Sequence, residues 1–318
     1  MGVEKADYPL PVVLARNERV IVVLPSGSIT GRDQALHLKA MAKSFFPNSA
    51  TSVAGTEPVI RSIALTRPLH WLLLGWHDTL HCGWISWAHG VLLSLSGLVL
   101  VAVFYRQFWL LSGALSGFLL VAPILATSLY ALSRAREREE KTDLQVVLKT
   151  WLNWQHRDKW GNEYWCLVQF GALLALAGTG WVLTSAALIT LLAPGSVLNP
   201  VDFLQHVVLA RNGFLFELWL AVGGVLAAPI FASSVIAIPL LLDRRLRLWQ
   251  AVITSWRVVL ANPLPMAFWA ALIMVLTLLG MVSFLLGLIG VVPLLGHASW
   301  HAYRDLVDAS ALPEQDPL

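Results

Sequence analysis

One stretch, Leu264 to Tyr303, decides the fold: "LPMAFWAALIMVLTLLGMVSFLLGLIGVVPLLGHASWHAY". It contains no aspartate, glutamate, lysine or arginine. As a single helix rising ~1.5 Å per residue it would be about 60 Å long, about twice the ~30 Å hydrocarbon core of a bilayer. The stretch must therefore fold back on itself as a membrane hairpin. We expect the turn near Ser283–Gly287, because glycine adopts strained backbone conformations at the lowest cost.

The composition extends this prediction to the rest of the chain. Of its 318 residues 57% are apolar and only 13% are charged, whereas a soluble domain carries about 25% charged residues. Several runs long enough to cross a bilayer lack any charge. The charged residues among the first twenty predict that no secretory signal leads the chain. We predict an all-α polytopic bundle of six transmembrane helices, at 82–105, 107–134, 164–192, 215–242, 264–284 and 286–306.

The positions of the basic residues predict the orientation. All but two of the 22 lysines and arginines lie before the first helix, in the 134–163 and 243–263 loops, or at Arg304. Arg106 and Arg211 alone fall on the other side. Basic residues are enriched in cytoplasmic loops. The sequence therefore predicts a multi-pass protein of the bacterial inner membrane with both termini in the cytoplasm.

An internal repeat is visible in the second, fourth and sixth predicted helices. "GFLLVAPILATSLYALSR" (117–134) and "GLIGVVPLLGHASWHAYR" (287–304) share a Gly-to-Pro spacing of six and a Pro-to-Arg spacing of eleven. The fourth helix keeps the first spacing, from Gly223 to Pro229. Each hairpin also follows a stretch with a small residue before tryptophan, which predicts a cytoplasmic interfacial amphipathic helix: Gly75-Trp76, Thr150-Trp151 and Ser255-Trp256. We predict three pseudo-repeated hairpins; chance resemblance between glycine- and proline-containing membrane helices is the alternative.

The prolines of this repeat predict helix kinks and a polar layer. Pro123, Pro229 and Pro293 each leave the carbonyl four residues earlier without its helical donor. In hydrocarbon such a carbonyl needs another partner. Small polar residues recur four and five positions after the prolines, and His297 takes the first of these positions in the last helix. We predict an inward-facing polar layer of Thr127, Ser128, Ser233, Ser234 and His297.

Histidines are the main candidates for bound groups. His297 and His301 are four residues apart and so share a helical face. His89 lies at a similar predicted depth in the first helix. These three residues suit either a divalent metal or axial ligation of a haem. The alternatives are a structural hydrogen bond from His297 to another helix and a proton or solute path. We weight the structural role highest and predict no cofactor.

The basic residues at the inner helix ends suit anionic lipid headgroups: Arg134, Arg244, Arg245 and Arg304. Outside the membrane domain (57–308), the sequence predicts a cytoplasmic extension (1–56) and a disordered tail (309–318). The extension contains a predicted strand pair within 11–25 and a short helix within 30–45. The outer connection 193–214 is predicted to hold a short amphipathic helix.

Several of these stretches resemble a bacterial family of integral membrane proteins known as domain of unknown function 2189. The stretches are 68–78, 117–134, 236–245, 261–273 and 287–307, so the resemblance extends over 57–308. It implies a multi-helix inner-membrane protein without an established activity. Some members are labelled cytochrome c oxidase, but this chain lacks the His-Pro-Glu-Val-Tyr stretch of the oxidase catalytic subunit.

Three functions follow from these features, in order of preference. The first is a non-enzymatic accessory, assembly or scaffold protein that binds a larger membrane complex, such as a respiratory complex, within the lipid bilayer. The second is a small transporter or channel whose polar path follows the pseudo-axis past Thr127, Ser233 and His297. The third is haem or metal binding. No motif for nucleic-acid binding, phosphate binding or nucleophilic catalysis occurs, so an enzyme is not the favoured class.

Overall fold

The structure, a computed structural model, divides into two compact units, Met1–Gly55 and Thr56–Leu318. This division falls beside the predicted boundary between residues 56 and 57. The described residues are 12–16, 19–23, 57–104, 126–152, 165–210 and 214–315, together with 111, 114, 115 and 118. The two units are treated separately below.

In the first unit two short strands form a hairpin. Strand β1 (Val12–Arg16) pairs antiparallel with β2 (Arg19–Val23), and Arg16 faces Arg19 across the turn. Runs of β-branched residues favour strands, so this predicted pair is confirmed. The helix predicted within 30–45 lies outside the described residues.

The first third of the second unit begins with the two-residue strand β3 (Val59–Ile60). Helix α2 (Arg67–Cys82) follows and stops at Gly83, whose φ of 59° is a left-handed conformation that favours glycine. Helix α3 (Trp84–Phe104) confirms the predicted helix at 82–105. Most of the helix predicted at 107–134, including Pro123, lies outside the described residues. Its C-terminal end is α5 (Thr127–Glu137).

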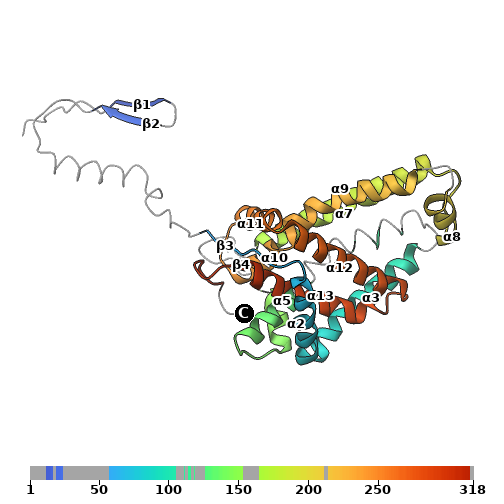
Figure 1. Ribbon diagram of the computed structural model, residues 1–318, viewed down its shortest axis with the longest axis horizontal. Helices are drawn as coiled ribbons and strands as arrows, with labels where there is room; N and C mark the ends of the chain where they lie inside the picture. Colours follow the sequence, from blue (N-terminus) through green and yellow to red (C-terminus); the bar gives the residue numbers. More distant parts are fainter. Residues whose placement is uncertain are drawn as a thin grey trace, which may run out of the picture. The chain divides into compact units, whose positions relative to one another are not determined.

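The middle third contains a second amphipathic helix and a long hairpin. Helix α6 (Leu144–Leu152) precedes α7 (Trp165–Leu192), which confirms the helix predicted at 164–192. The outer connection holds α8 (Pro200–Phe203) and the π-helix η2 (Leu204–Val208), at the end of the unit opposite α11 (Figure 1). The return helix is divided, as α9 (Leu215–Ser234) and α10 (Ala237–Asp243).

The last third contains an amphipathic helix and the hairpin predicted from the charge-free stretch 264–303. Helix α11 (Leu248–Ala261) precedes α12 (Pro263–Val282) and α13 (Leu288–Leu306), so the predicted turn at Ser283–Gly287 is confirmed. We expected a glycine to adopt the left-handed conformation in this turn. Phe284 and Leu285 adopt it instead, at φ 56° and 66°. Gly287 instead permits close approach, because a Cβ there would lie 2.8 Å from the Cα of Gly280.

Among the described residues, four helices are long and apolar enough to cross a membrane: 84–104, 169–192, 215–243 and 263–282. Helix α13 is not one of them, because its C-terminal half carries polar and charged side chains. The structure therefore supports a mostly helical protein with four candidate spans in its described part. The predicted count of six remains a prediction.

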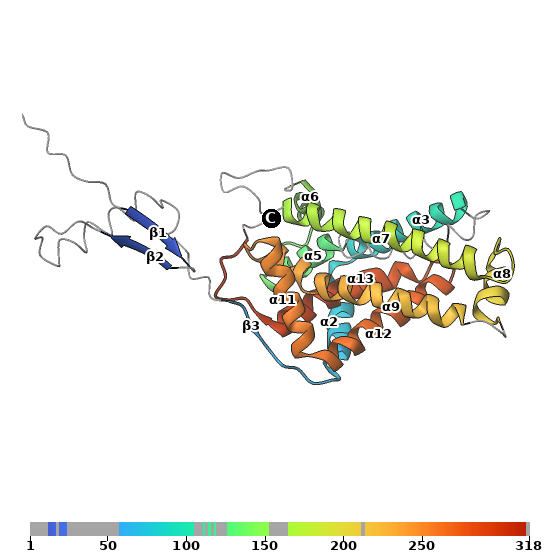
Figure 2. The same cartoon turned by 90° about the horizontal axis from the view of Figure 1, so that it is seen from above.

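Helix α13 lies at the centre of the packing. It contacts α2, α3, α5, α10 and α12, and the views in Figures 1 and 2 place it among these helices. The fully buried residues are concentrated where α5, α10 and α13 meet, and include Leu132, Leu240 and Tyr303. The core of the protein is therefore at the end of the helices that we predict to be cytoplasmic.

The two ends of the second unit meet at this core. Strand β3 pairs antiparallel with β4 (Val307–Asp308), and Arg61 forms an ion pair of 2.7 Å with Asp308. The segment 309–315 then packs over the C-terminal ends of α5 and α10, where Leu312 and Gln315 are buried. The prediction of a disordered tail is wrong for these residues, because backbone and side-chain hydrogen bonds and an apolar anchor hold them.

Candidate functional site

Six polar side chains from four helices form one connected group, which we call the His297 cluster: Asp78, Ser86, Ser133, Arg136, His297 and His301. His297 is fully buried. Its Nε2 lies 2.9 Å from Ser86 Oγ and its Nδ1 lies 2.7 Å from Ser133 Oγ. His297 therefore links α13 to both α3 and α5.

Asp78 determines the direction of the hydrogen bonds in this cluster. Ser133 donates its hydroxyl hydrogen to Asp78 Oδ2 at 2.6 Å, because an ionised carboxylate accepts only. The Ser133 oxygen must then accept from His297 Nδ1, which places the hydrogen of the neutral ring on Nδ1. His297 Nε2 is left as the acceptor for the Ser86 hydroxyl.

The same carboxylate holds two positively charged or protonatable groups. Arg136 donates to Asp78 Oδ1, and His301 Nε2 lies 2.9 Å from Oδ2. Burial by itself raises the pKa of Asp78, but hydrogen bonds from His301 and Ser133 outweigh it and the net pKa lies below the ordinary value. Asp78 is therefore ionised at neutral pH and joins α2 to α5 and α13.

His89 forms a separate pair beside this cluster. Its Nδ1 lies 2.8 Å from the carbonyl oxygen of Ile85, which makes Nδ1 the donor, and its Nε2 then accepts from Ser128 Oγ at 2.6 Å. Both ring nitrogens of His89 and of His297 thus have protein partners. The described residues contain no group of three side chains suited to a metal ion. Haem or metal binding by His89, His297 and His301 stays a prediction.

The residues of the predicted polar layer occupy different surroundings. Thr127, Ser128, Ser234 and His297 are buried. Ser233 is partly exposed and its Oγ accepts from Trp256 Nε1 at 2.9 Å. The structure thus turns four of the five away from the surface, while Ser233 binds the amphipathic helix α11.

Two of the three predicted kink prolines lie inside described helices, and they have contrasting neighbours. Pro293 lies in α13 and leaves the Ile289 carbonyl without its helical donor. Gly90 of α3 packs against that carbonyl so closely that a built Cβ would lie 2.1 Å from the oxygen. Pro229 lies in α9 and leaves the Val225 carbonyl without its helical donor, in a residue that is 72% exposed. The kink predicted at Pro123 lies outside the described residues.

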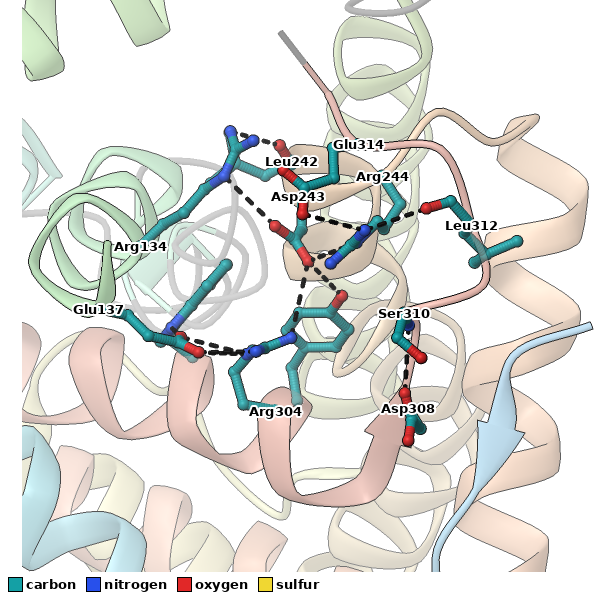
Figure 3. Close-up of polar contacts among 12 residues, drawn as sticks. Arg134, Glu137, Leu242, Asp243, Arg244, Arg304, Asp308, Ser310, Leu312 and Glu314 are labelled. Atoms are coloured by element: carbon teal, nitrogen blue, oxygen red, sulfur yellow. Dashed lines mark hydrogen bonds and ion pairs between the residues drawn. The ribbon is translucent and has the colours of Figure 1, made fainter. Parts of the chain in front are cut away.

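A second polar group joins the C-terminal ends of α5, α10 and α13, and Figure 3 shows its main members. We call it the Asp243 cluster: Arg134, Glu137, Arg138, Asp243, Arg244, Tyr303 and Arg304. Asp243 pairs with Arg134 at 3.3 Å and with Arg244 at 3.0 Å, and accepts from the Tyr303 hydroxyl at 2.7 Å. Arg304 binds Glu137 at 2.6 Å. One buried carboxylate therefore organises arginines from all three thirds of the unit, together with a tyrosine from the last third.

The four arginines predicted to bind lipid headgroups have different surroundings in the structure. We expected the guanidinium groups of Arg134 and Arg244 to face lipid headgroups. Their side chains are instead only 4% and 8% exposed and bind protein groups. The Arg304 side chain is 35% exposed. The backbone N–H of Arg245 donates to the Pro313 carbonyl. Headgroup contact by Arg245 and Arg304 stays a prediction.

Sequence reasoning missed the two organising carboxylates. Asp78 shares a helical face with Trp71, Gly75 and Cys82, all of which are buried. A carboxylate on an apolar helical face signals a buried pair, so this signal was present. Asp243 precedes two arginines at the end of a predicted helix, and this pattern is typical of a solvent-exposed helix end. Its burial depends on the C-terminal segment, which no local pattern connects to it.

The family comparison supports the resemblance over part of the chain. The model of the family described as predicted integral membrane protein, domain of unknown function 2189, matches residues 110–243. This match is shorter than the 57–308 that we expected and excludes the stretch 287–307. No curated protein and no solved structure matches the chain. Together with the apolar helices, the match identifies an integral membrane protein of unknown function.

Proposed function

We propose that the protein is a non-enzymatic accessory or scaffold protein of the bacterial inner membrane, built from three pseudo-repeated units with both termini in the cytoplasm. The single observation that carries this proposal is the packed centre formed by α5, α10 and α13. The polar side chains there bind one another, which suits a rigid support for a larger membrane complex.

The pairing of β3 with β4 supports an even number of membrane crossings. Residues 59–60 and 307–308 are hydrogen-bonded neighbours, so they lie in one compartment. Between them the described part of the unit contains four candidate spans. Six crossings require that α13 and the segment ending in α5 also cross. The excess of basic residues on the paired side supports a cytoplasmic location.

The order of helix contacts supports the three pseudo-repeated units. The amphipathic helices α2, α6 and α11 contact the returning helices α13, α5 and α9–α10, respectively. Each amphipathic helix therefore packs on the return helix of the unit before it, when the third unit is counted as preceding the first. The return helices α5, α10 and α13 also contact one another. A cyclic arrangement of three related units would give this order.

The small-residue–tryptophan pairs support the same relation. Gly75, Thr150 and Ser255 are buried, while the tryptophans that follow them are 45%, 39% and 38% exposed. Gly75 packs against α13, since a Cβ there would lie 2.7 Å from the backbone nitrogen of Ala298. Ser255 Oγ accepts from the Ile236 backbone N–H at 3.1 Å. The exposed tryptophans suit the headgroup layer.

The packed centre favours the scaffold over a pore along the pseudo-axis. Leu240, Leu242 and Tyr303 are fully buried where the three return helices meet. Ser233, which the path would pass, binds Trp256 near the surface of α11. Both observations favour a structural role for the polar residues.

The test is purification from native membranes in mild detergent, followed by two measurements. The scaffold predicts co-purification with a larger membrane complex at a fixed stoichiometry. It also predicts a flat visible absorption spectrum and no solute-dependent flux after reconstitution into proteoliposomes. A haem Soret band, a stoichiometric metal, or flux abolished by His297→Ala would overturn the proposal.

A further inference from the structure

We propose that the C-terminal strap (residues 309–315) covers a binding site for a phosphate-bearing anion, formed by Arg134, Arg138 and Arg244. The strap supplies the oxygen atoms that these guanidinium groups bind in the closed structure. This inference does not depend on the scaffold proposal.

Oxygen atoms of the strap meet all three arginines (Figure 3 shows those on Arg244). Arg244 Nη1 donates to the Leu312 carbonyl at 3.0 Å and lies 3.3 Å from Glu314 Oε1. Arg138 Nη2 binds Glu314 Oε2 at 3.0 Å. Arg134 Nη2 donates to the Gln315 carbonyl at 2.8 Å. The strap therefore presents two carbonyl oxygens and one carboxylate to three guanidinium groups.

When the strap opens, the charges beneath it favour the binding of an anion. The Asp243 cluster contains four arginines but only two carboxylates, Glu137 and Asp243. Glu314 is the third carboxylate within reach, and it belongs to the strap. Opening of the strap removes one negative charge and three acceptor groups together. Arginine binds phosphate oxygens through charge-assisted, often bidentate hydrogen bonds, so a phosphoryl group replaces these acceptors well.

The strap is attached in a way that permits opening. It has two apolar anchors that pack on the core, the small side chain of Ala309 and the side chain of Leu312. Its backbone is held by hydrogen bonds from Arg245 N–H to the Pro313 carbonyl and from Gln315 N–H to the Asp243 carbonyl. The Glu314 side chain is 57% exposed, so solvent reaches the ion pairs at the edge of the site.

The experiment compares the full chain with two opened variants in neutral detergent micelles. One variant ends at Ser310, and the other is full-length Glu314→Lys, which places a cation beside Arg138 and Arg244. Thermal unfolding is followed while phosphatidylglycerol, phosphatidylcholine or soluble glycerol phosphate is added, because a ligand of the folded state raises its melting temperature. We expect the half-maximal phosphatidylglycerol concentration to be at least ten times lower for the opened variants.

The probes distinguish the source of the phosphate. Stabilisation by phosphatidylglycerol alone identifies a lipid headgroup, whereas stabilisation by glycerol phosphate as well identifies a free phosphate anion. In the opened variants, Arg138→Gln is expected to weaken binding at least three-fold. Arg257→Gln is the matched control, since Arg257 pairs with Glu57 outside the site. Equal response of closed and opened chains, an equal effect of phosphatidylcholine, or equal effects of the two arginine changes overturns the proposal.

Discussion

At the residue scale, Asp78 has more consequences for the packing than any histidine that the sequence singled out. Its carboxylate binds Ser133 and Arg136 of α5 and His301 of α13, and through Ser133 it orients His297. When a carboxylate that pairs with several groups is removed, all of these groups lose a hydrogen-bond or ion-pair partner.

We predict that Asp78→Ala lowers the free energy of unfolding by about 3 kcal/mol, because Arg136 loses its buried counter-ion. The measurement is denaturant or thermal unfolding in detergent micelles. His70→Ala is the control, because His70 is exposed on the same helix and lies outside the His297 cluster. Similar losses for the two variants would contradict the role given to Asp78.

The pKa of Asp78 predicts how stability depends on pH. Its folded-state pKa lies below the ordinary value, so the stabilisation is present above the unfolded pKa, about 3.9. It is lost as the pH falls through the folded pKa. Melting temperatures measured from pH 7 down to pH 3 should fall less steeply for Asp78→Asn than for the unaltered chain. Parallel curves would show that Asp78 contributes nothing to acid sensitivity.

At the element scale, the packing of α3 on α13 depends on Gly90. A Cβ at this position would lie 2.1 Å from the Ile289 carbonyl oxygen, a backbone atom that cannot rotate away. We predict that Gly90→Ala lowers the free energy of unfolding by about 2 kcal/mol, since overpacking forces the helices apart.

Gly224 in α9 provides the control for this change, because nothing lies within 4 Å of a Cβ built there. Gly224→Ala should be neutral or raise stability by up to about 1 kcal/mol, as alanine favours helix more than glycine does. Equal destabilisation by the two substitutions in thermal unfolding would refute the close contact between α3 and α13.

Elements were predicted well where local chemistry determines them. The hairpin of α12 and α13 and its turn follow from the length of the charge-free run, and the pairing of β1 with β2 follows from β-branched residues around a short polar turn. The strap was predicted wrongly, because its polar composition resembles a solvated tail. Its order comes from arginines far away in the sequence, and such contacts leave no local pattern.

The candidate site was predicted in part for the same reason. His297 was placed in the protein interior by its position in the repeat, and the structure buries it. Its partners Ser86 and Ser133, and Asp78 bound behind Ser133, come from three other helices. Which serine meets which histidine depends on the rotation of each helix, and the apolar faces of membrane helices specify that rotation poorly.

At the scale of the whole molecule, Asp243 joins the three thirds of the second unit. It binds Arg134 from the first third, Arg244 beside it and Tyr303 from the last third. We predict that Asp243→Ala lowers the free energy of unfolding by at least about 3 kcal/mol, because it leaves buried arginines without a counter-ion.

The control for Asp243 is Asp202→Ala in the outer connection. Asp202 accepts from Asn199 and the Leu198 backbone in an exposed turn, so its removal should affect unfolding little. Limited proteolysis of the two variants provides a second measurement. Faster cleavage between α5 and α6 in Asp243→Ala, but not in Asp202→Ala, is the expected result.

The proposed topology requires the polypeptide to cross the bilayer an even number of times and to return to the cytoplasm. The most direct measurement places a tag at residue 1, a tag at residue 318 and a single reactive cysteine at Ser196, in three otherwise matched chains, and probes intact cells with impermeant reagents. We predict that only the cysteine at position 196 is labelled from outside. Labelling of either terminal tag from outside would contradict this topology.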